Sequence, residues 1–212
     1  LPVGLVHEDY RPYHMRHHRF TQQENDPDLI LSKPFPITKT SLARKLLRDL
    51  TGLPFLRLRA FQLKEAWGHQ ALATSGHISH LWRGFGRIIL VNLLIWAALN
   101  TMGYGYLYFL LWLLPLATTN QLMARIRNIA EHAVIPDDKD DYRNARTTMA
   151  CPLARTFLAP YWVNYHVAHH LFVNVPCYNL PRAHEIMRQK GITDRMEIKP
   201  GYMSVLKEAT SR

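Results

Sequence analysis

The longest stretch without an ionisable acidic or basic side chain constrains this fold more than any other feature of the sequence. It runs from Ile88 to Ala124 and contains no Asp, Glu, Lys, Arg or His. All 26 Lys and Arg lie outside it. About 20 apolar residues cross the hydrocarbon core of a bilayer, and this stretch is nearly twice as long. The sequence therefore predicts segments that cross a membrane.

A break in the middle of this stretch divides it into two spans. Asn100, Gly103 and Gly105 favour a tight turn at 101–105, between spans at 84–102 and 104–122. The turn carries no charge, whereas basic side chains lie at the start of the first span and after the end of the second. Because positive charge is retained in the cytoplasm, both long flanks are predicted to be cytoplasmic. The alternative is a helical hairpin buried in the core of a soluble protein.

The predicted fold is an all-α integral membrane protein, with a transmembrane helical hairpin and a cytoplasmic helical cap. We expect one domain over 1–212, in which 1–83 and 123–212 are cytoplasmic and 84–122 form the hairpin. The net charge of +10 is compatible with nucleic acid, anionic lipid or an acidic ligand. The adjoining spans favour lipid, which is the predicted partner of a basic amphipathic helix from Ser41 to Gly52. Ser41 is its expected N-cap.

Two copies of the pattern His-x-x-His-His stand on either side of the hairpin. They comprise His14, His17 and His18 in the first copy and His166, His169 and His170 in the second. On a helix, residues at i, i+3 and i+4 share one face, so each copy directs three imidazoles toward one point. Imidazole suits iron, zinc, copper and nickel. The repeated pattern predicts a metal site, whereas a single copy is also compatible with a surface histidine cluster.

Further polar residues are positioned to assist such a site. His132 and Asn128 are four residues apart after the second span and share a helix face. The side chains that we consider as hydrogen-bond partners of metal-bound imidazoles are Asp26, Asp28, Glu131 and Asn164. An Asp-Pro turn explains the first two equally well. His69, His77 and His80 lack the complete pattern, and we interpret them as structural or surface residues.

These motifs together resemble the membrane fatty acid desaturase family. The segment from Tyr10 to His18 resembles the second histidine box of that family, and the segment from Asn164 to Phe172 resembles the third. Two further segments resemble sequences of this family, namely Ala130-Glu131-His132 and Arg146-Thr147-Thr148. The resemblance covers most of the chain, and the motifs are specific in combination.

The resemblance implies a di-iron centre on the cytoplasmic side of the membrane. The residues that it identifies as iron ligands are His14, His17, His18, His132, His166, His169 and His170. Asn128 matches a position that holds iron through a water molecule in some members. The family also has a first histidine box upstream, which this chain does not contain. We therefore expect the chain to lack the N-terminal part of a desaturase, including at least two ligands.

The implied reaction is the introduction of a double bond into a fatty acyl chain, with O₂ as co-substrate. The expected partners are a fatty acyl lipid, acyl-CoA or acyl-carrier substrate, membrane lipid, and a separate electron donor of the ferredoxin or cytochrome type. No nucleic acid is expected. Two alternatives remain open. One is a membrane lipid hydroxylase or oxygenase with the same boxes, and the other is a non-catalytic membrane fragment that binds metal.

The predicted topology is tested by a reporter fused after Arg212. If both flanks are cytoplasmic, an alkaline phosphatase fusion is inactive at this position, and a fluorescent protein that matures in the cytoplasm is bright. The opposite pattern would overturn the predicted orientation.

Overall fold

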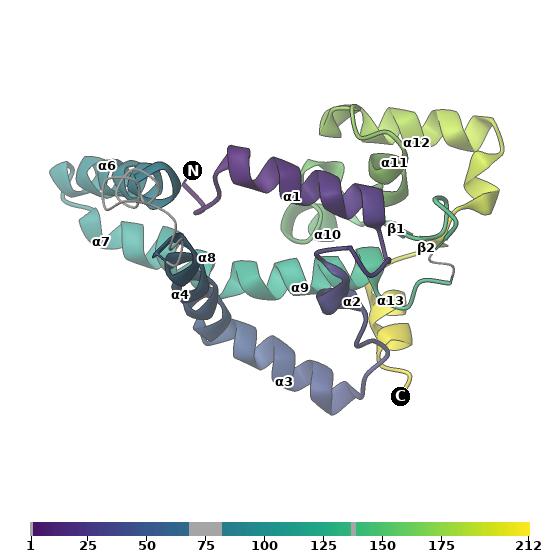
Figure 1. The fold of residues 1–212 in the computed structure, drawn as a ribbon, viewed down its shortest axis with the longest axis horizontal. Helices are drawn as coiled ribbons and strands as arrows, with labels where there is room; N and C mark the ends of the chain where they lie inside the picture. The colour runs from purple at the N-terminus through teal and green to yellow at the C-terminus, as the bar shows by residue number, and fades with distance from the viewer. Residues whose placement is uncertain (1, 68–81, 137–138) are drawn as a thin grey trace. The chain divides into compact units, whose positions relative to one another are not determined.

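The computed structural model describes residues 2–67, 82–136 and 139–212, and these residues are mostly helical. They form two compact units. Unit 1 consists of Leu1–Tyr13 and Lys45–Leu122, and unit 2 of His14–Arg44 and Met123–Arg212. Figure 1 labels the elements along the chain. His69, His77 and His80 lie outside the described residues, so their interpretation as structural or surface residues stays a prediction.

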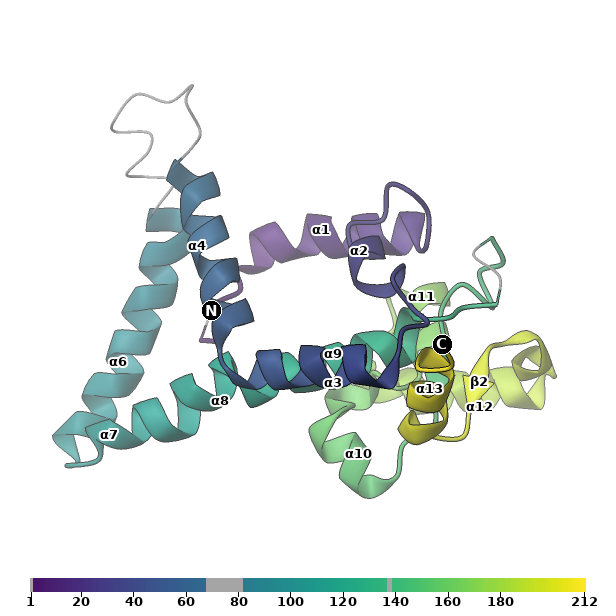
Figure 2. The same ribbon diagram turned by 90° about the horizontal axis from the view of Figure 1, so that it is seen from below.

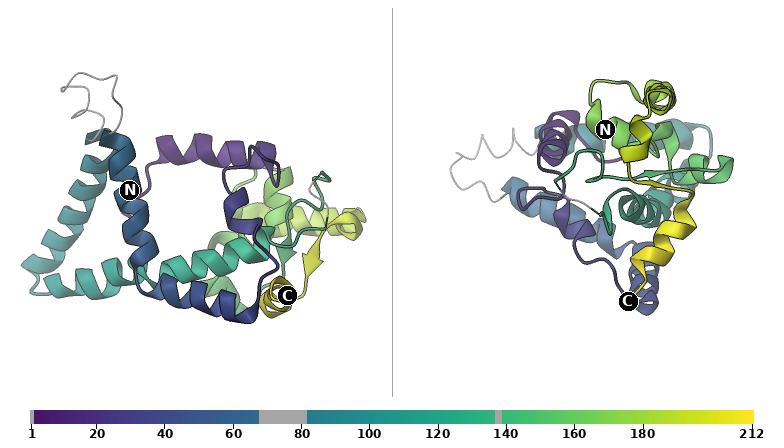
Figure 3. Two further views of the ribbon diagram at one scale, coloured as in Figure 1. Left: turned by 60° about the horizontal axis from the view of Figure 1, so that its bottom comes forward. Right: turned by 90° about the vertical axis from the view of Figure 1, so that its right-hand side faces the viewer.

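Unit 1 holds most of the apolar stretch. Its elements are α4 (Leu53–Trp67), the π-helix η1 (Trp82–Gly86), α6 (Arg87–Thr101), α7 (Gly105–Leu107), the π-helix η2 (Tyr108–Leu113) and α8 (Leu114–Ala117). The chain turns between α6 and α7, where Gly103 adopts a φ of +81°, a conformation that glycine tolerates best. Figures 2 and 3 show that α6 and the run from α7 to α8 leave this turn at an open angle.

A polar contact joins the two sides of this turn. The Tyr108 hydroxyl donates a hydrogen bond of 2.9 Å to Asn92 Oδ1, and Asn92 Nδ2 donates to the Ile88 carbonyl at 2.8 Å. Among the described residues, one helix, Gly105–His132, is long and apolar enough to cross a membrane. The apolar helix α6 is shorter. The predicted pair of spans and the cytoplasmic cap stay predictions.

Unit 2 combines two separate parts of the chain and consists mainly of short helices. Its elements are α2 (Leu29–Ser32), α10 (Pro152–Phe157), η3 (Pro160–Trp162), α11 (His166–Leu171), η4 (Cys177–Asn179), α12 (Leu180–Gln189), η5 (Ile192–Arg195) and α13 (Tyr202–Ala209). It also contains parts of α1 (His7–Phe20), α3 (Lys39–Leu50) and α9 (Thr119–His132). These helices position all seven predicted histidine ligands.

Two predicted helix starts differ from the structure. From the sequence, Pro12 suits the first turn of the helix that carries the first histidine pattern. In the structure α1 begins at His7, so Pro12 lies inside the helix. The Val6 carbonyl accepts hydrogen bonds from the amides of Asp9 and Tyr10, which starts the helix earlier. The helix α3 begins at Lys39, because Thr38 Oγ1 accepts the Ser41 amide at 3.2 Å. Thr38 therefore has the N-cap role that we expected for Ser41.

A small sheet departs from the predicted all-α fold. Strand β1 (Thr147–Thr148) pairs in parallel with β2 (Ile198–Lys199). Strands of two residues have no hydrophobic periodicity, so sequence patterns do not reveal them. The sheet forms because the two segments, distant in sequence, meet in unit 2.

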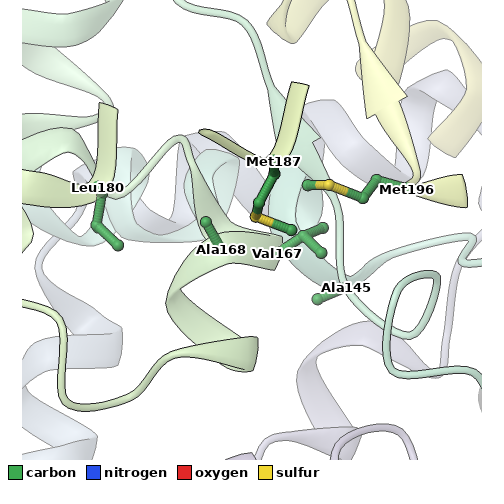
Figure 4. Packing of buried hydrophobic residues seen from close by; sticks show 6 residues of the cluster. All are labelled: Ala145, Val167, Ala168, Leu180, Met187 and Met196. Carbon is green, nitrogen blue, oxygen red and sulfur yellow. The ribbon is translucent and has the colours of Figure 1, made fainter. Parts of the chain in front are cut away.

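The main core of unit 2 lies between α11 and α12. Figure 4 shows Val167 and Ala168 of α11 close to Leu180 and Met187 of α12. Val167 and Ala168 are completely buried, while the three histidines occupy other positions of the same helix. Packing of this apolar face therefore sets the direction of the imidazoles.

This packing predicts a stability difference between two leucine substitutions. Leu180 is 2% exposed, so Leu180→Ala should cost about 2–5 kcal/mol of unfolding free energy and lower the melting temperature. Leu153 on α10 is 69% exposed, so Leu153→Ala should change the free energy by about 0.5 kcal/mol or less. Thermal unfolding in detergent, followed by circular dichroism, measures both. Equal effects would contradict the assigned core.

Candidate metal centre

Seven histidines from three helices form two adjacent groups in unit 2. His17, His132, His166 and His170 form a four-histidine group, and His14, His18 and His169 form a three-histidine group. Within each group, the ligand nitrogens lie within 4.8 Å of one another. The helices α1 and α11 contribute three histidines each, because they carry the two His-x-x-His-His patterns. The helix α9 contributes its last residue, His132.

The three-histidine group is a triangle of Nε2 atoms. The distances are 3.0 Å between His14 and His18, 3.1 Å between His18 and His169, and 3.2 Å between His14 and His169. A point slightly above the plane of such a triangle is about 2 Å from all three nitrogens. This is the length of a bond from imidazole to a transition metal, about 2.0–2.1 Å for zinc. The triangle therefore fits one metal ion.

The four-histidine group is connected in the same way but lies deeper. Its Nε2 atoms are separated by 3.2 Å from His17 to His132, 2.8 Å from His132 to His166 and 3.0 Å from His166 to His170. His17, His132 and His166 are each 6% exposed or less. Four inward nitrogens in a buried site are suited to a second metal ion.

The protonation of these rings favours metal binding over hydrogen bonding. A neutral imidazole has one donor and one acceptor nitrogen. His17 Nδ1 lies 2.8 Å from Asp26 Oδ1, and a carboxylate accepts, so Nδ1 carries the hydrogen and Nε2 faces the group with a lone pair. Converging lone pairs repel one another unless a cation lies between them. The donor set of the site thus fits the metal that its pattern predicts.

The surroundings keep five of the imidazoles neutral. Burial, reinforced by the neighbouring imidazoles, lowers the pKa of His18 to about 3 and that of His169 to about 4. The same causes lower the pKa of His14 and hold the pKa values of His166 and His170 well below the usual range. Their nitrogens are therefore available as metal ligands at neutral pH.

Acidic side chains lie behind the rings. Burial raises the pKa of Asp26, but the hydrogen bonds from His17, Asp28 and Gln22 outweigh it, and the net pKa is lowered. Asp26 is therefore an ionised carboxylate in contact with His17. Asp28 Oδ2 lies 3.7 Å from the same Nδ1, and Glu131 Oε1 lies 3.8 Å from His166 Nδ1. These two are too far for direct hydrogen bonds.

The two asparagines in the predicted set occupy different surroundings. Asn164 is 3% exposed, and its Oδ1 has no hydrogen-bond partner among the described residues. Its backbone carbonyl accepts a hydrogen bond of 3.1 Å from the Thr148 amide. Asn128 is half-buried on α9, four residues before His132.

Sequence reasoning missed Thr21, which connects the two histidine boxes. Its side chain is 2% exposed, and Oγ1 lies 2.9 Å from the His17 carbonyl and 3.2 Å from His170 Nδ1. The hydroxyl donates to the carbonyl and accepts from His170, so His170 Nε2 faces the four-histidine group with its lone pair. The available signal was its position three residues after His18, one turn along the helix face.

A small pocket reaches both histidine groups. Its volume is about 160 Å³. The residues that line it are His18, Thr21, Asp141, Asn144, His170 and Leu171. Pockets for larger ligands measure about 300–1,000 Å³, whereas one water molecule occupies about 30 Å³. The size and polarity of this pocket suit a few water molecules or a diatomic molecule.

A comparison with known protein families agrees with this site. The profile described as "Fatty acid desaturase" matches residues 1–198, which is nearly the whole chain. The chain belongs to the fatty acid desaturase family. This family is membrane-bound, uses iron and comprises oxidoreductases that act on fatty acids. No curated protein and no solved structure matched the chain.

The contact between His17 and Asp26 generates a test of this desaturase-family site. Asp26→Asn removes the carboxylate that orients His17, so metal affinity should fall by about 10- to 100-fold. Asp28→Asn is the matched control, because Asp28 Oδ2 lies beyond hydrogen-bond distance of His17 Nδ1, and its effect on metal affinity should be smaller. Equilibrium dialysis with Fe²⁺ under anaerobic conditions measures both variants. A larger loss in Asp28→Asn would contradict the assigned role of Asp26.

Proposed function

We propose that this protein introduces a double bond into a fatty acyl chain, using O₂ and two iron ions bound by the histidine groups. The proposed ligands are His14, His17, His18, His132, His166, His169 and His170, with Asn128 binding through a water molecule. One observation carries the proposal: in a chain of the desaturase family, seven imidazoles converge in two adjacent groups. An unactivated acyl C–H bond requires a stronger oxidant than any side chain provides.

The iron ions, when bound, supply the redox chemistry that activates O₂. The overall reaction removes two hydrogen atoms from adjacent acyl carbons and forms a carbon–carbon double bond. O₂ receives these two hydrogen atoms, together with two electrons and two protons from outside the substrate, and is released as two water molecules. The balance therefore requires an electron donor, which we propose is a separate ferredoxin- or cytochrome-type protein.

The side chains of the centre contribute geometry and charge. Imidazole ligands provide no negative charge to offset two cations. The ionised Asp26 contacts His17 and supplies part of the negative charge that the cations require. It also fixes the hydrogen of His17 on Nδ1, the ring nitrogen that faces away from the group. Thr21, which directly follows α1, likewise fixes the hydrogen of His170 on its outer ring nitrogen. These contacts hold the inner nitrogens in place for metal binding.

The proposed location of this centre is the cytoplasmic side of a multi-pass membrane protein. The basic flanks and the apolar helix Gly105–His132 support this arrangement. The substrate is then an acyl lipid, acyl-CoA or an acyl-carrier conjugate. The polar pocket beside the centre is too small for such a chain and is suited to water or O₂.

The mass of the product separates desaturation from oxygen insertion. The purified protein, supplied with an electron donor and a fatty acyl substrate, should give a product two mass units lighter than the substrate. A product heavier by one oxygen atom would establish a hydroxylase instead. Iron binding without either product would support a metal-binding fragment without activity.

Substitution of a single ligand tests the centre itself. His169→Ala should lower both iron content and activity, the latter by at least about 100-fold, because loss of a ligand exceeds the loss of an outer contact. His7→Ala is the control, since His7 is exposed on α1 and belongs to neither group. Iron is measured by mass spectrometry and activity by product formation. Normal iron content in His169→Ala would reject its assignment as a ligand.

A further inference from the structure

The segment Arg146-Thr147-Thr148 is almost completely enclosed in unit 2. Arg146 and Thr147 are 0% exposed and Thr148 is 2% exposed. None of the three forms a hydrogen bond with a ligand nitrogen of the histidine groups, and the proposed reaction assigns them no role. A buried guanidinium is costly unless it is paired and hydrogen-bonded, so its contacts indicate what it stabilises.

Those contacts converge on the end of α9, which terminates at His132. The last four carbonyls of a helix have no partner within that helix. Thr148 Oγ1 donates to the Ala130 carbonyl at 3.2 Å, and the Arg146 amide donates to the Glu131 carbonyl at 2.8 Å. Gln22 Nε2 donates to the His132 carbonyl at 2.8 Å. Each carbonyl from Ala130 to His132 therefore has a donor from elsewhere in unit 2.

The guanidinium continues this pattern beyond the helix. Its two terminal nitrogens donate to the carbonyls of Ala133 and Val134, at 2.8 and 2.7 Å. Val134 has a φ of +52°, which is strained for a β-branched residue. Arg146 Nε lies 3.3 Å from Glu197 Oε1, which compensates its charge. Arg146 thus holds the chain in the reversal that directly follows His132.

The same segment also contacts the start of α11. Thr147 Oγ1 accepts the Val167 amide at 3.3 Å, next to His166. The Thr148 amide donates to the Asn164 carbonyl at 3.1 Å. One short segment therefore connects the helix end that carries His132 to the helix start that carries His166. The Nε2 atoms of these two histidines are 2.8 Å apart, which is shorter than the other distances between Nε2 atoms given above.

We propose that Arg146 and Thr148 are positioning residues that place His132 in the four-histidine group. This inference rests on the proposed function, because it assumes that both groups bind metal. Of the seven histidines, α9 contributes only His132, and none of its residues belongs to the three-histidine group. Loss of the contacts at the end of α9 should therefore weaken one metal site and spare the other.

Titration of the metal-free protein with Co²⁺, followed by absorbance, tests this inference. The unmodified protein should bind in two steps. His132→Ala identifies the step of the four-histidine group, and His14→Ala identifies that of the three-histidine group. Thr148→Val removes the hydroxyl at nearly constant volume, and Arg146→Lys keeps the charge but not the paired donors. Both should weaken the His132 step by about 10- to 100-fold and change the other by less than about twofold.

Two control variants separate positioning from general destabilisation. Thr148→Ser retains the hydroxyl and should restore the His132 step. Thr156→Val removes a hydroxyl that bonds the Pro152 carbonyl on exposed α10, and it should alter neither step. Should Arg146→Lys not fold, as judged by circular dichroism, the comparison of Thr148→Val with Thr148→Ser still decides.

Two results would overturn the inference while the proposed function stands. One is an unchanged His132 step in Thr148→Val, and the other is equal weakening of both steps. A protein without any Co²⁺ binding would instead reject the proposed metal centre, and the positioning role with it. Selective weakening of the His132 step, restored by Thr148→Ser, would establish the role.

Discussion

Seven imidazole nitrogens that face one another at about 3 Å impose the strictest condition on this protein. Converging lone pairs are unfavourable without a cation, and protonated rings at these distances repel one another. The structure meets the condition by burial, which lowers the pKa of rings such as His166 and His170, and by hydrogen-bond acceptors behind the rings, such as Asp26 at His17. Unit 2 therefore has two tasks: to bring three helices together and to keep each ring in the correct tautomer. Both tasks are compatible with a family that uses iron.

The helix ends carry much of this organisation. His132 is the last residue of α9, and His166 is the first of α11, so both lie where backbone groups need partners from outside the helix. Buried side chains provide these partners, with Arg146 and Thr148 at the end of α9 and Thr147 beside His166. A helix interior satisfies its own backbone, whereas a helix end takes its position from the residues that bind it. The placement of the central histidines thus depends on polar residues distant in sequence.

The apolar residues of the chain serve two different environments. In unit 2, Val167, Leu180 and Met187 are enclosed and hold α11 against α12. In unit 1, many large apolar side chains of α6 and η2 are exposed, which is compatible with contact to lipid in a membrane-bound family. Family membership, the apolar helix Gly105–His132 and the histidine groups support one description, that of a membrane oxidoreductase acting on fatty acids.

The sequence by itself determined the features that depend on local spacing. Two His-x-x-His-His patterns specify which six imidazoles share helix faces, because helical periodicity depends only on the spacing of residues near one another in the chain. The uncharged stretch specifies an apolar helical segment. Tertiary structure alone decided how the patterns combine. It divided seven histidines into groups of four and three, and it placed Thr21 between the boxes and Arg146 at the end of α9. It also paired β1 with β2. These features arise from contacts between residues far apart in the chain, for which local periodicity contains no signal.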